Sequence, residues 1–486
     1  MAPLDAIYRT SLALLTDLYQ LTMAYGYWKT QRAEREAVFH LFFRTDPFQG
    51  GYAIAAGLEY VLDYLQHFHF SRDDIEYLAG IEGNDGRPLF SQEFLAYLAE
   101  LELRVDVDAV PEGTVVFAHE PLIRVRGPIL QCQILETVLL NLVNFQTLIA
   151  TKAARICGAT GGDPVLEFGL RRAQGIDGAL AASRAAYIGG CAATSNVLAG
   201  KLFGIPVKGT HAHSWVMSFD DELSSFEAYA AAMPNNCVFL VDTYDTLDGV
   251  RKAIEVGRKL RESGHEMVGV RLDSGDLAEL SIRARRLLDE AGFPDASIVA
   301  SNDLDEGSIV SLKEQGAAIA VWGVGTKLVT GYDQPALGGV YKLGAMRNEQ
   351  GEWEPKVKLS EQAIKTSIPG ILQVRRFQDN DGAVADVIYN EIDGAHEETV
   401  MIDLLDPTRR TAMDPELDAN DLLVPVVRNG EVVLQNEELA AIRERTRQQL
   451  GLFQSAMCRH VDPDRYPVGL EVALHDLKTD LIRRAC

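Results

Sequence analysis

The feature of this sequence that most limits its fold is a pattern repeated seven times between residues 164 and 326. In each repeat, a short apolar or β-branched run ends in Gly, Asp, Asn or His, and a helical stretch follows. The seven runs are 164–170, 185–190, 206–213, 237–242, 267–273, 297–303 and 318–326. Their starts follow one another at roughly 20 to 30 residues, which is the spacing of βα units joined by right-handed crossovers.

All seven runs end in polar residues or glycine. In a TIM barrel the carboxyl ends of the strands surround one mouth, whereas in an open doubly wound sheet the polar ends gather at a switch point. Because every run carries such an end, the sequence favours an α/β fold with an incomplete TIM-like β/α barrel of about seven strands. Between the runs, helical spacing is clear over 195–203, 246–263, 277–291 and 305–315.

The two flanks of the chain lack this pattern. Strand candidates occur at 37–43 and 114–126, and again at 339–343, 384–390 and 422–433, while amphipathic helices are expected over 11–28 and 437–450. We therefore predict a discontinuous α+β domain built from residues 1–130 and 345–486. The β/α barrel-like catalytic domain would then comprise residues 131–344.

Charge and cysteine content limit the partners and the compartment. With 46 basic and 70 acidic residues the formal net charge is −24, which argues against a nucleic-acid partner. The six cysteines include no CxxC pair, so reduced thiols are expected. Residues 1–10 lack the basic start of an export signal, and no run of about 20 apolar residues could span a bilayer. We expect a cytoplasmic protein with no membrane partner.

The segment Lys-Gly-Thr-His-Ala-His-Ser, residues 208–214, ends the third run. On a strand, His211 and His213 would point to the same side. A buried structural role is the simplest interpretation of a single histidine, and a metal site would need further ligands from later strands. The only later histidine of the repeats, His265, stands at the start of a run. The alternative is a nucleophile or general base, because neutral imidazole is available near pH 7.

Two further strand ends carry groups suited to anions. Gly323, Gly325 and Thr326 end the seventh run, where backbone N–H groups and a hydroxyl could hold a phosphate, although Gly-x-Gly is also a common turn. In the fifth run, Arg271 and Asp273 share a face and could simply pair with each other. Alternatively, Arg271 would bind a substrate carboxylate and Asp273 a hydroxyl or a magnesium ion.

Read in order along the chain, these motifs resemble the nicotinate phosphoribosyltransferase family. The resemblance is carried by LTDLYQLTM, FFRTDPFQGGY, FGLRRAQGIDGA, GTHAHSWVMSF, RLDSGDL, SNDLDE, WGVGTKLVT and GGVYKL. It covers about two thirds of the chain, and beyond about Ser360 no function is assigned.

The resemblance implies transfer of ribose 5-phosphate from phosphoribosyl pyrophosphate to the ring nitrogen of nicotinate, coupled to ATP hydrolysis, in the salvage branch of NAD biosynthesis. It implies His213 as the phosphorylated histidine and Mg²⁺ as cofactor, with no metal ligand identified. It implies nicotinate binding by Tyr19, Phe168, Thr210 and Arg271, and phosphoribosyl pyrophosphate binding by Arg171, Asp273, Gly323, Gly325 and Thr326. Tyr19 would come from a second subunit, which implies a homodimer with a shared active site.

Two other hypotheses stay open. One is a related phosphoribosyltransferase for nicotinamide or quinolinate. Arg271 argues against the neutral amide, and quinolinate should need a more basic pocket. The other is a catalytically silent binding protein of the same fold, which would have no need to keep His213, Asp273 and Thr326 together. A histidine at position 211 is not expected from the resemblance, and its role is open.

Overall fold

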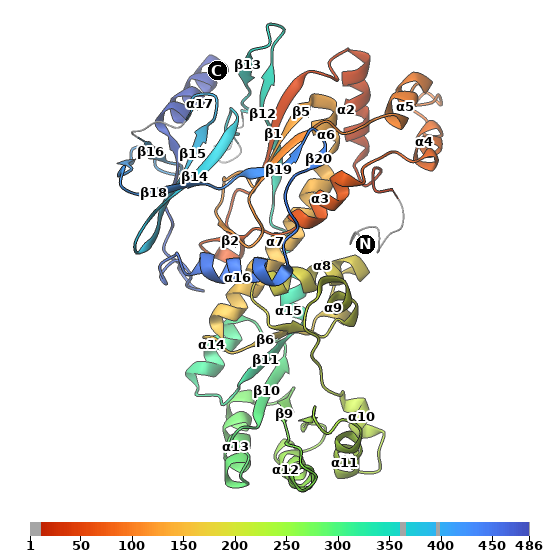
Figure 1. The fold of residues 1–486 in the computed structure, drawn as a ribbon, viewed down its shortest axis with the longest axis vertical. Coiled ribbons are helices and arrows are strands. Elements are labelled where there is room, and N and C mark those ends of the chain that lie inside the picture. Colours follow the sequence, from red (N-terminus) through yellow and green to blue (C-terminus); the bar gives the residue numbers. More distant parts are fainter. Residues whose placement is uncertain (1–10, 360–365, 395–398, 486) are drawn as a thin grey trace. The chain divides into compact units, whose positions relative to one another are not determined.

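The computed structural model describes residues 11–359, 366–394 and 399–485. Residues 1–10, in which no export signal was expected, lie outside this range, as do Ser360 and Cys486. The chain divides into two compact units. Unit 1 comprises residues 1–148 and 336–486, and unit 2 comprises residues 149–335. Figure 1 shows the elements of both units in sequence colours.

Unit 2 is built on a parallel sheet of six strands in the order β7-β6-β11-β10-β9-β8. Its strands are β6 (Val165–Glu167), β7 (Ala193–Thr194), β8 (Val238–Leu240), β9 (Gly269–Leu272), β10 (Ser297–Asn302) and β11 (Val321–Val324). Its helices include α8 (Gly175–Ile188), α9 (Val197–Phe203), α10 (His213–Met217), α11 (Glu222–Ala232), α12 (Thr246–Glu262), α13 (Leu277–Glu290), α14 (Glu306–Glu314) and α15 (Thr326–Val329), with a short turn η2 (Leu170–Arg172). Helices α11, α12 and α13 pack in a row beside the strands (Figure 1).

Two of the seven predicted strands are wrong, and the sheet has six. Residues 185–188 of the run 185–190 form the end of helix α8, because alanine favours helix and the apolar stretch continues a longer helical pattern. The second strand is instead β7, Ala193–Thr194, which is too short to carry a recognisable pattern. The run 206–213 forms a single bridge between Val207 and Thr194 rather than a strand.

Unit 1 contains two larger sheets. The seven-stranded sheet has the order β13-β12-β1-β5-β3-β19-β20, and the six-stranded sheet has the order β17-β16-β21-β15-β14-β18. The first consists of β1 (Glu36–Phe42), β3 (Asp106–Ala109), β5 (Ile123–Pro128), β12 (Val340–Arg347), β13 (Trp353–Pro355), β19 (Val424–Arg428) and β20 (Glu431–Val432). The second consists of β14 (Leu372–Asp379), β15 (Gly382–Asn390), β16 (Val400–Asp403), β17 (Arg410–Ala412), β18 (Asp418–Asp421) and β21 (Val468–Glu471). The strand candidates at 37–43, 339–343 and 384–390 and the helix candidate at 437–450 are confirmed within a few residues. The candidates 114–126 and 422–433 are each divided into two shorter strands, and the helix expected over 11–28 begins only at Leu18.

The remaining elements of unit 1 are mainly helical. They are α2 (Leu18–Lys29), η1 (Pro47–Gln49), α3 (Leu58–Gln66), α4 (Arg72–Ala79), α5 (Gln92–Ala99), α6 (Ile129–Ile134), α16 (Leu439–Leu450) and α17 (Val472–Ala485), with the short pair β2 (Ala53–Ile54) and β4 (Val115–Val116). Helix α7 (Glu136–Ala159) continues from unit 1 into unit 2.

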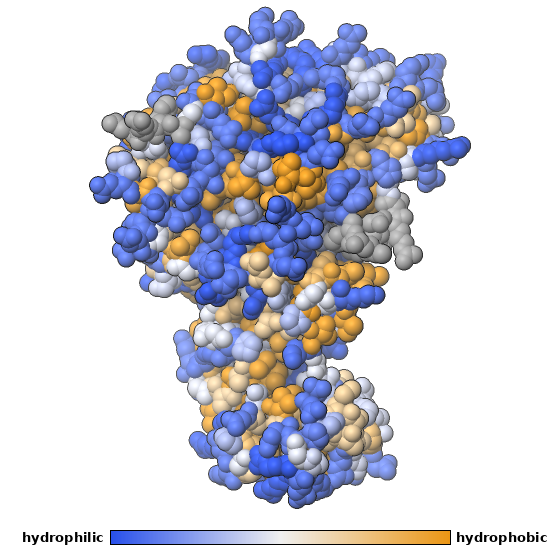
Figure 2. Space-filling view, viewed as in Figure 1, coloured by the Kyte–Doolittle hydropathy of each residue, from blue (hydrophilic) through white to orange (hydrophobic). Residues whose placement is uncertain are grey.

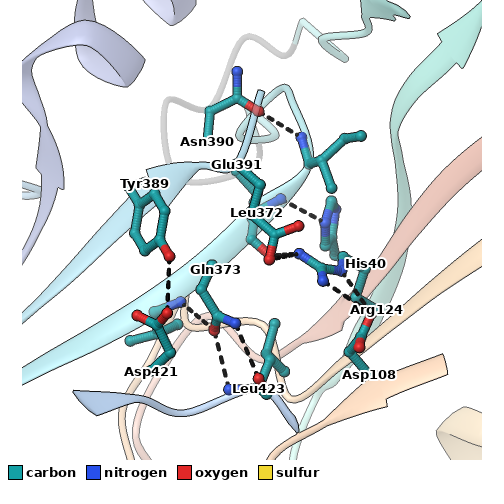
Figure 3. Close-up of polar contacts among 12 residues, drawn as sticks. His40, Asp108, Arg124, Leu372, Gln373, Tyr389, Asn390, Glu391, Asp421 and Leu423 are labelled. Carbon is teal, nitrogen blue, oxygen red and sulfur yellow. Dashed lines mark hydrogen bonds and ion pairs between the residues drawn. The ribbon is translucent and has the colours of Figure 1, made fainter. Parts of the chain in front are cut away.

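A polar network joins the two large sheets of unit 1 (Figure 3). Arg124 on β5 donates to Asp108 on β3 at 3.1 and 2.9 Å and to the carbonyl of Leu372 on β14 at 3.0 Å. The N–H of Leu372 in turn donates to His40 Nε2 on β1 at 3.1 Å. Burial and the charge of Arg124 lower the pKa of His40 to about 3. His40 is therefore a neutral acceptor in the interior.

Polar residues cover most of the face in Figure 2, in keeping with the high content of charged residues. In the described part of the chain, none of the helices combines the length and the apolar character needed to cross a bilayer.

Candidate active site

A cavity of about 300 Å³ in unit 2 opens at the carboxyl ends of strands β6, β8 and β9. It is lined by Phe168, Leu170, Arg171, Ser195, Gly209, Thr210, His211, Ala212, His213, Leu240, Arg271 and Asp273. Six of the residues predicted for the site therefore face one cavity: Phe168, Arg171, Thr210, His213, Arg271 and Asp273. Phe168, Arg271 and Asp273 come together because the carboxyl ends of parallel strands share one edge of the sheet. Thr210 and His213 come from the segment between the bridge at Val207 and helix α10.

Arg271 is the centre of the polar contacts in this cavity. Its Nε donates to Ser301 at 2.7 Å, one terminal nitrogen donates to Thr210 at 3.0 Å, and the other donates to Asp273 at 2.9 Å. These bonds use three of the five N–H donors of a guanidinium. The predicted pairing of Arg271 with Asp273 is present, and the arginine keeps capacity for a ligand.

Phe168 lies beside this guanidinium, whose central carbon is 5.7 Å from the ring centroid. A Cβ atom on Gly323 would lie 2.7 Å from the Phe168 ring, and one on Gly325 would lie 3.1 Å from the Phe168 carbonyl. A side chain at position 323 would therefore displace the Phe168 ring, and one at position 325 would crowd the Phe168 carbonyl. Packing alone accounts for glycine at these two positions, and their role in phosphate binding stays a prediction.

His213 begins helix α10, and its side chain is 40% exposed. Its Nε2 lies 3.1 Å from Oδ1 of Asp242, a carboxylate at the end of β8 that is almost fully buried. The second oxygen of Asp242 accepts from the backbone N–H of Asp273 at 2.9 Å and from the Ser274 hydroxyl at 2.6 Å. Asp242 therefore fixes the His213 ring and the loop after β9 at the same time.

His211 occupies a different environment, although it lies only two residues away. It is 8% exposed, and its Nε2 accepts from the backbone N–H of Leu240 at 3.2 Å. Burial is the main cause that lowers the pKa of His211 to about 4, and the nearby Arg271 and His213 lower it further. His211 is therefore neutral near pH 7.

The loop that carries Phe168 is held by buried Glu167. This carboxylate accepts from the N–H of Gly169, from the Ser183 hydroxyl at 2.8 Å and from the Thr194 hydroxyl at 2.6 Å. These bonds join the ends of β6 and β7 and the middle of α8 beneath the cavity.

The other predicted residues lie as follows. Arg171 is exposed in the turn η2 at the edge of the cavity. Thr326 opens helix α15 directly after β11, which pairs with β6. Tyr19 lies on α2 in unit 1 and is 48% exposed.

Sequence reasoning missed Asp242 and Ser301 as site residues. Both stand at the ends of predicted strands, so the same rule that selected Arg271 and Asp273 could have selected them. What the sequence lacks is any sign of their partners, which lie about 30 residues away in the chain.

The described residues contain no group of three or more His, Cys, Asp or Glu side chains arranged to hold a metal ion. Asp273 uses Oδ1 for both Arg271 and Ser301. A magnesium ion that arrives with an anionic substrate would need only one or two protein carboxylates, and the second oxygen of Asp273 fits that requirement.

An aromatic face, a partly free guanidinium and a carboxylate-bound imidazole meet at one strand-end cavity of this α/β unit, an arrangement that can hold a small planar anion. Models of the nicotinate phosphoribosyltransferase N-terminal domain, family and C-terminal domain match residues 14–144, 165–383 and 373–478. The chain belongs to the nicotinate phosphoribosyltransferase family.

Individual relatives agree with the family models. Nicotinate phosphoribosyltransferase of Bacillus subtilis is 45% identical over 95% of this chain and 93% of its own length. The human enzyme of the same name is 38% identical over 76% of this chain and 78% of its own length. A crystal structure of human nicotinic acid phosphoribosyltransferase superposes with a TM-score of 0.83 at 32% identity, covering 96% of this chain and 99% of that one.

Proposed function

We propose that this protein makes nicotinate mononucleotide from nicotinate and phosphoribosyl pyrophosphate, with ATP hydrolysis coupled through a phosphohistidine. One observation carries the proposal: Arg271, Phe168 and His213 line the same cavity. We place the reaction in the cytoplasm, in the salvage branch of NAD biosynthesis. Unit 2 would be the catalytic unit. Its six-stranded sheet and the segment 206–213 would together form the incomplete barrel.

Nicotinate is a flat, electron-poor ring with one carboxylate. Phe168 offers a face for the ring, and the two remaining donors of Arg271 offer a charge-assisted site for the carboxylate, with the Thr210 hydroxyl beside it. Nicotinamide would leave the guanidinium without an anion. Quinolinate would bring a second carboxylate, for which Arg171 at the edge of the cavity is the one further cation among the described lining residues.

His213 is suited to accept the γ-phosphoryl group of ATP. Its Nε2 faces Asp242, which favours a proton on that nitrogen and leaves the lone pair on Nδ1. Nδ1 would attack the γ-phosphorus, the bond to the β–γ bridging oxygen would break, and ADP would leave. Asp242 would stabilise the positive charge that develops on the ring.

We propose that phosphoribosyl pyrophosphate is held by Arg171, Asp273, Gly323, Gly325 and Thr326. When bound, Mg²⁺ would neutralise charge on the departing pyrophosphate. The Asp273 carboxylate is fixed for this task by Arg271 and Ser301.

Labelling with γ-³²P ATP tests this function directly. The wild-type protein should take up acid-labile label and form nicotinate mononucleotide. His213→Ala should lose the label, and His211→Ala should keep at least part of it. Label that persists in His213→Ala and disappears in His211→Ala would move the nucleophile to His211. No label and no product in the wild-type protein would contradict the function itself.

We further propose a homodimer in which Tyr19 completes the partner's pocket. Leu18, Tyr19 and Met23 are large, apolar or aromatic, and exposed on one face of α2, and Leu15 is exposed just before the helix begins. Exposed stripes of this kind mark interaction surfaces.

A second apolar patch lies on unit 2 near the cavity. Ile176, Val197 and Leu198 on α8 and α9 are exposed, and Leu170 lines the cavity. Figure 2 shows this orange patch over α8 and α9.

Mixing two inactive variants tests the shared site. Tyr19→Ala and His213→Ala should each be nearly inactive alone. After mixing and subunit exchange, half of the dimers are mixed and one of their two sites is intact, so about a quarter of the activity should return. Two variants that stay inactive after proven exchange would refute the sharing of Tyr19.

A further inference from the structure

The two histidines of the segment 208–214 contact the last residue of strand β8 and the chain just after it in matched register. His211 contacts Leu240 and His213 contacts Asp242, so each histidine meets the residue 29 positions further along the chain. The two histidines are two positions apart in the chain, and so are their two partners. This is the spacing at which side chains on one side of an extended segment repeat.

Residues 206–213 run between the two edge strands of the six-stranded sheet. On one side they pair through the backbone: the N–H of Thr194 donates to the carbonyl of Pro206, and the N–H of Lys208 donates to the carbonyl of Thr194, both at 3.0 Å. On the other side, no backbone hydrogen bond joins residues 209–213 to residues 238–242, all of which the structure describes.

Leu240 needs an acceptor on this open side. Its neighbour Val241 donates its N–H to the carbonyl of Arg271 on β9, and successive N–H groups of a strand point in opposite directions. The N–H of Leu240 therefore faces away from β9, in a residue that is 1% exposed. His211 Nε2 is the acceptor that it finds.

The His211 ring is also held by aromatic side chains. It meets Tyr229 edge-on at a centroid distance of 4.8 Å and lies 6.2 Å from the ring of Phe226. Both aromatic residues belong to α11. The ring thus has one hydrogen-bonded edge and a packed face, which fixes its position.

We propose that His211 is a positioning residue that replaces the missing backbone ladder and sets the place of Thr210 and His213 at the cavity. The two histidines divide the work: the first pins the segment to β8 through a neutral nitrogen, and the second carries the phosphoryl group. This assignment rests on the proposed function only for the role of His213. The contact between His211 and Leu240 stands independently of it.

Thr210 and His213 flank the pinned residue, and each makes one bond in the cavity, to Arg271 and to Asp242. Release of the segment would move both groups relative to their partners. A displacement of about 1 Å at a reacting group can slow a reaction by up to 100-fold.

Two substitutions distinguish the hydrogen-bond acceptor of His211 from the aromatic packing of its ring. His211→Phe keeps the aromatic packing and removes the acceptor, whereas His211→Gln places an oxygen near the position of Nε2. We expect His211→Phe to slow labelling of His213 by 10- to 100-fold and to raise the KM for nicotinate, and His211→Gln to return within about threefold of wild type. His265→Phe is the matched control, because His265 contacts Asn235, which precedes the amino end of β8, and lines none of this cavity. It should behave as wild type.

Amide hydrogen exchange at Leu240 gives a readout that needs no activity. The amide should exchange at least tenfold faster in His211→Phe than in the wild-type protein and be protected again in His211→Gln. Unchanged exchange in His211→Phe would overturn the proposal, and so would a labelling rate at the wild-type level. Equal loss of label in both variants would overturn the positioning role and indicate that the imidazole of His211 itself takes part in the phosphoryl transfer. Absence of label in the wild-type protein would contradict the proposed function and leave the exchange result to decide the role of His211.

Discussion

The cavity of unit 2 and the polar network of unit 1 in Figure 3 are both built around an arginine that binds an aspartate. In the network, the side chains of Arg124 and Asp108 are 8% and 9% exposed, and Arg124 also binds the Leu372 carbonyl and Glu391. In the cavity, Arg271 and Asp273 are 16% and 29% exposed. Arg271 keeps two donors unassigned among the described residues.

The difference lies in what surrounds the ion pair. Arg124 joins two sheets and has almost no bonding capacity left, so its removal should affect folding. Arg271 is fixed by Ser301 and Asp273 but faces a cavity, so its removal should affect binding. Water can replace a lost partner in the cavity, whereas in the network it cannot. Four predictions test this contrast, from the largest expected effect to the smallest.

Arg124→Met should lower the free energy of unfolding by about 3 kcal/mol, because it leaves buried Asp108 and the Leu372 carbonyl short of a donor. The kcat/KM of the molecules that remain folded should stay within about twofold of wild type, since Arg124 does not line the cavity. Urea unfolding combined with assays of the folded fraction measures both. A variant with unchanged stability and a raised KM would contradict the assignment of Arg124 to folding rather than to ligand binding.

Arg271→Met should lower kcat/KM for nicotinate about 100-fold, which corresponds to about 2.7 kcal/mol, because the carboxylate loses its charge-assisted hydrogen bonds. The effect should appear mainly in the KM, and the free energy of unfolding should change far less than in Arg124→Met. Nicotinamide, tested as a poor substrate or weak inhibitor, is the control ligand. An equal loss for both ligands would count against carboxylate recognition.

The pH dependence of stability should report on His40. Folding lowers its pKa from the usual 6.5 to about 3, so between these pH values the unfolded chain binds a proton that the folded protein does not. The stabilisation is therefore complete above pH 6.5 and is lost as the pH falls toward 3, with a slope of up to about 1.4 kcal/mol per pH unit. His40→Gln, which keeps an acceptor for Leu372, should show a shallower slope. Identical slopes would mean that His40 does not titrate as a buried neutral group.

Arg72→Ala should change the free energy of unfolding by less than about 0.5 kcal/mol. Arg72 and Glu76 form an ion pair on α4, but their side chains are 92% and 61% exposed. Exposed pairs contribute little because water and salt screen them. Thermal unfolding at low and high salt measures the effect. A loss comparable to that of Arg124→Met would show that burial does not separate the two kinds of pair.

Much of the fold was accessible from the sequence because it is encoded locally. Helices α12 and α13 were predicted almost to the residue, since apolar side chains recur along them at helical spacing and Asp245 and Asp276 cap their first turns. The error at 185–190 has a local cause as well. A short apolar run rich in alanine can be mistaken for a strand when the helical spacing of the residues before it is not considered.

The sequence by itself determined which chemical groups stand at the strand ends: an imidazole, a guanidinium, carboxylates and an aromatic ring. Only the tertiary structure decided how they pair. It joined His213 to Asp242, Arg271 to Ser301 and Thr210, and Phe168 to Gly323. It also separated two histidines that lie two positions apart into one buried acceptor and one group that faces the cavity. Side-chain periodicity depends on neighbours within a few positions, whereas these pairings depend on strand order and register, which bring together residues about 30 to 155 positions apart.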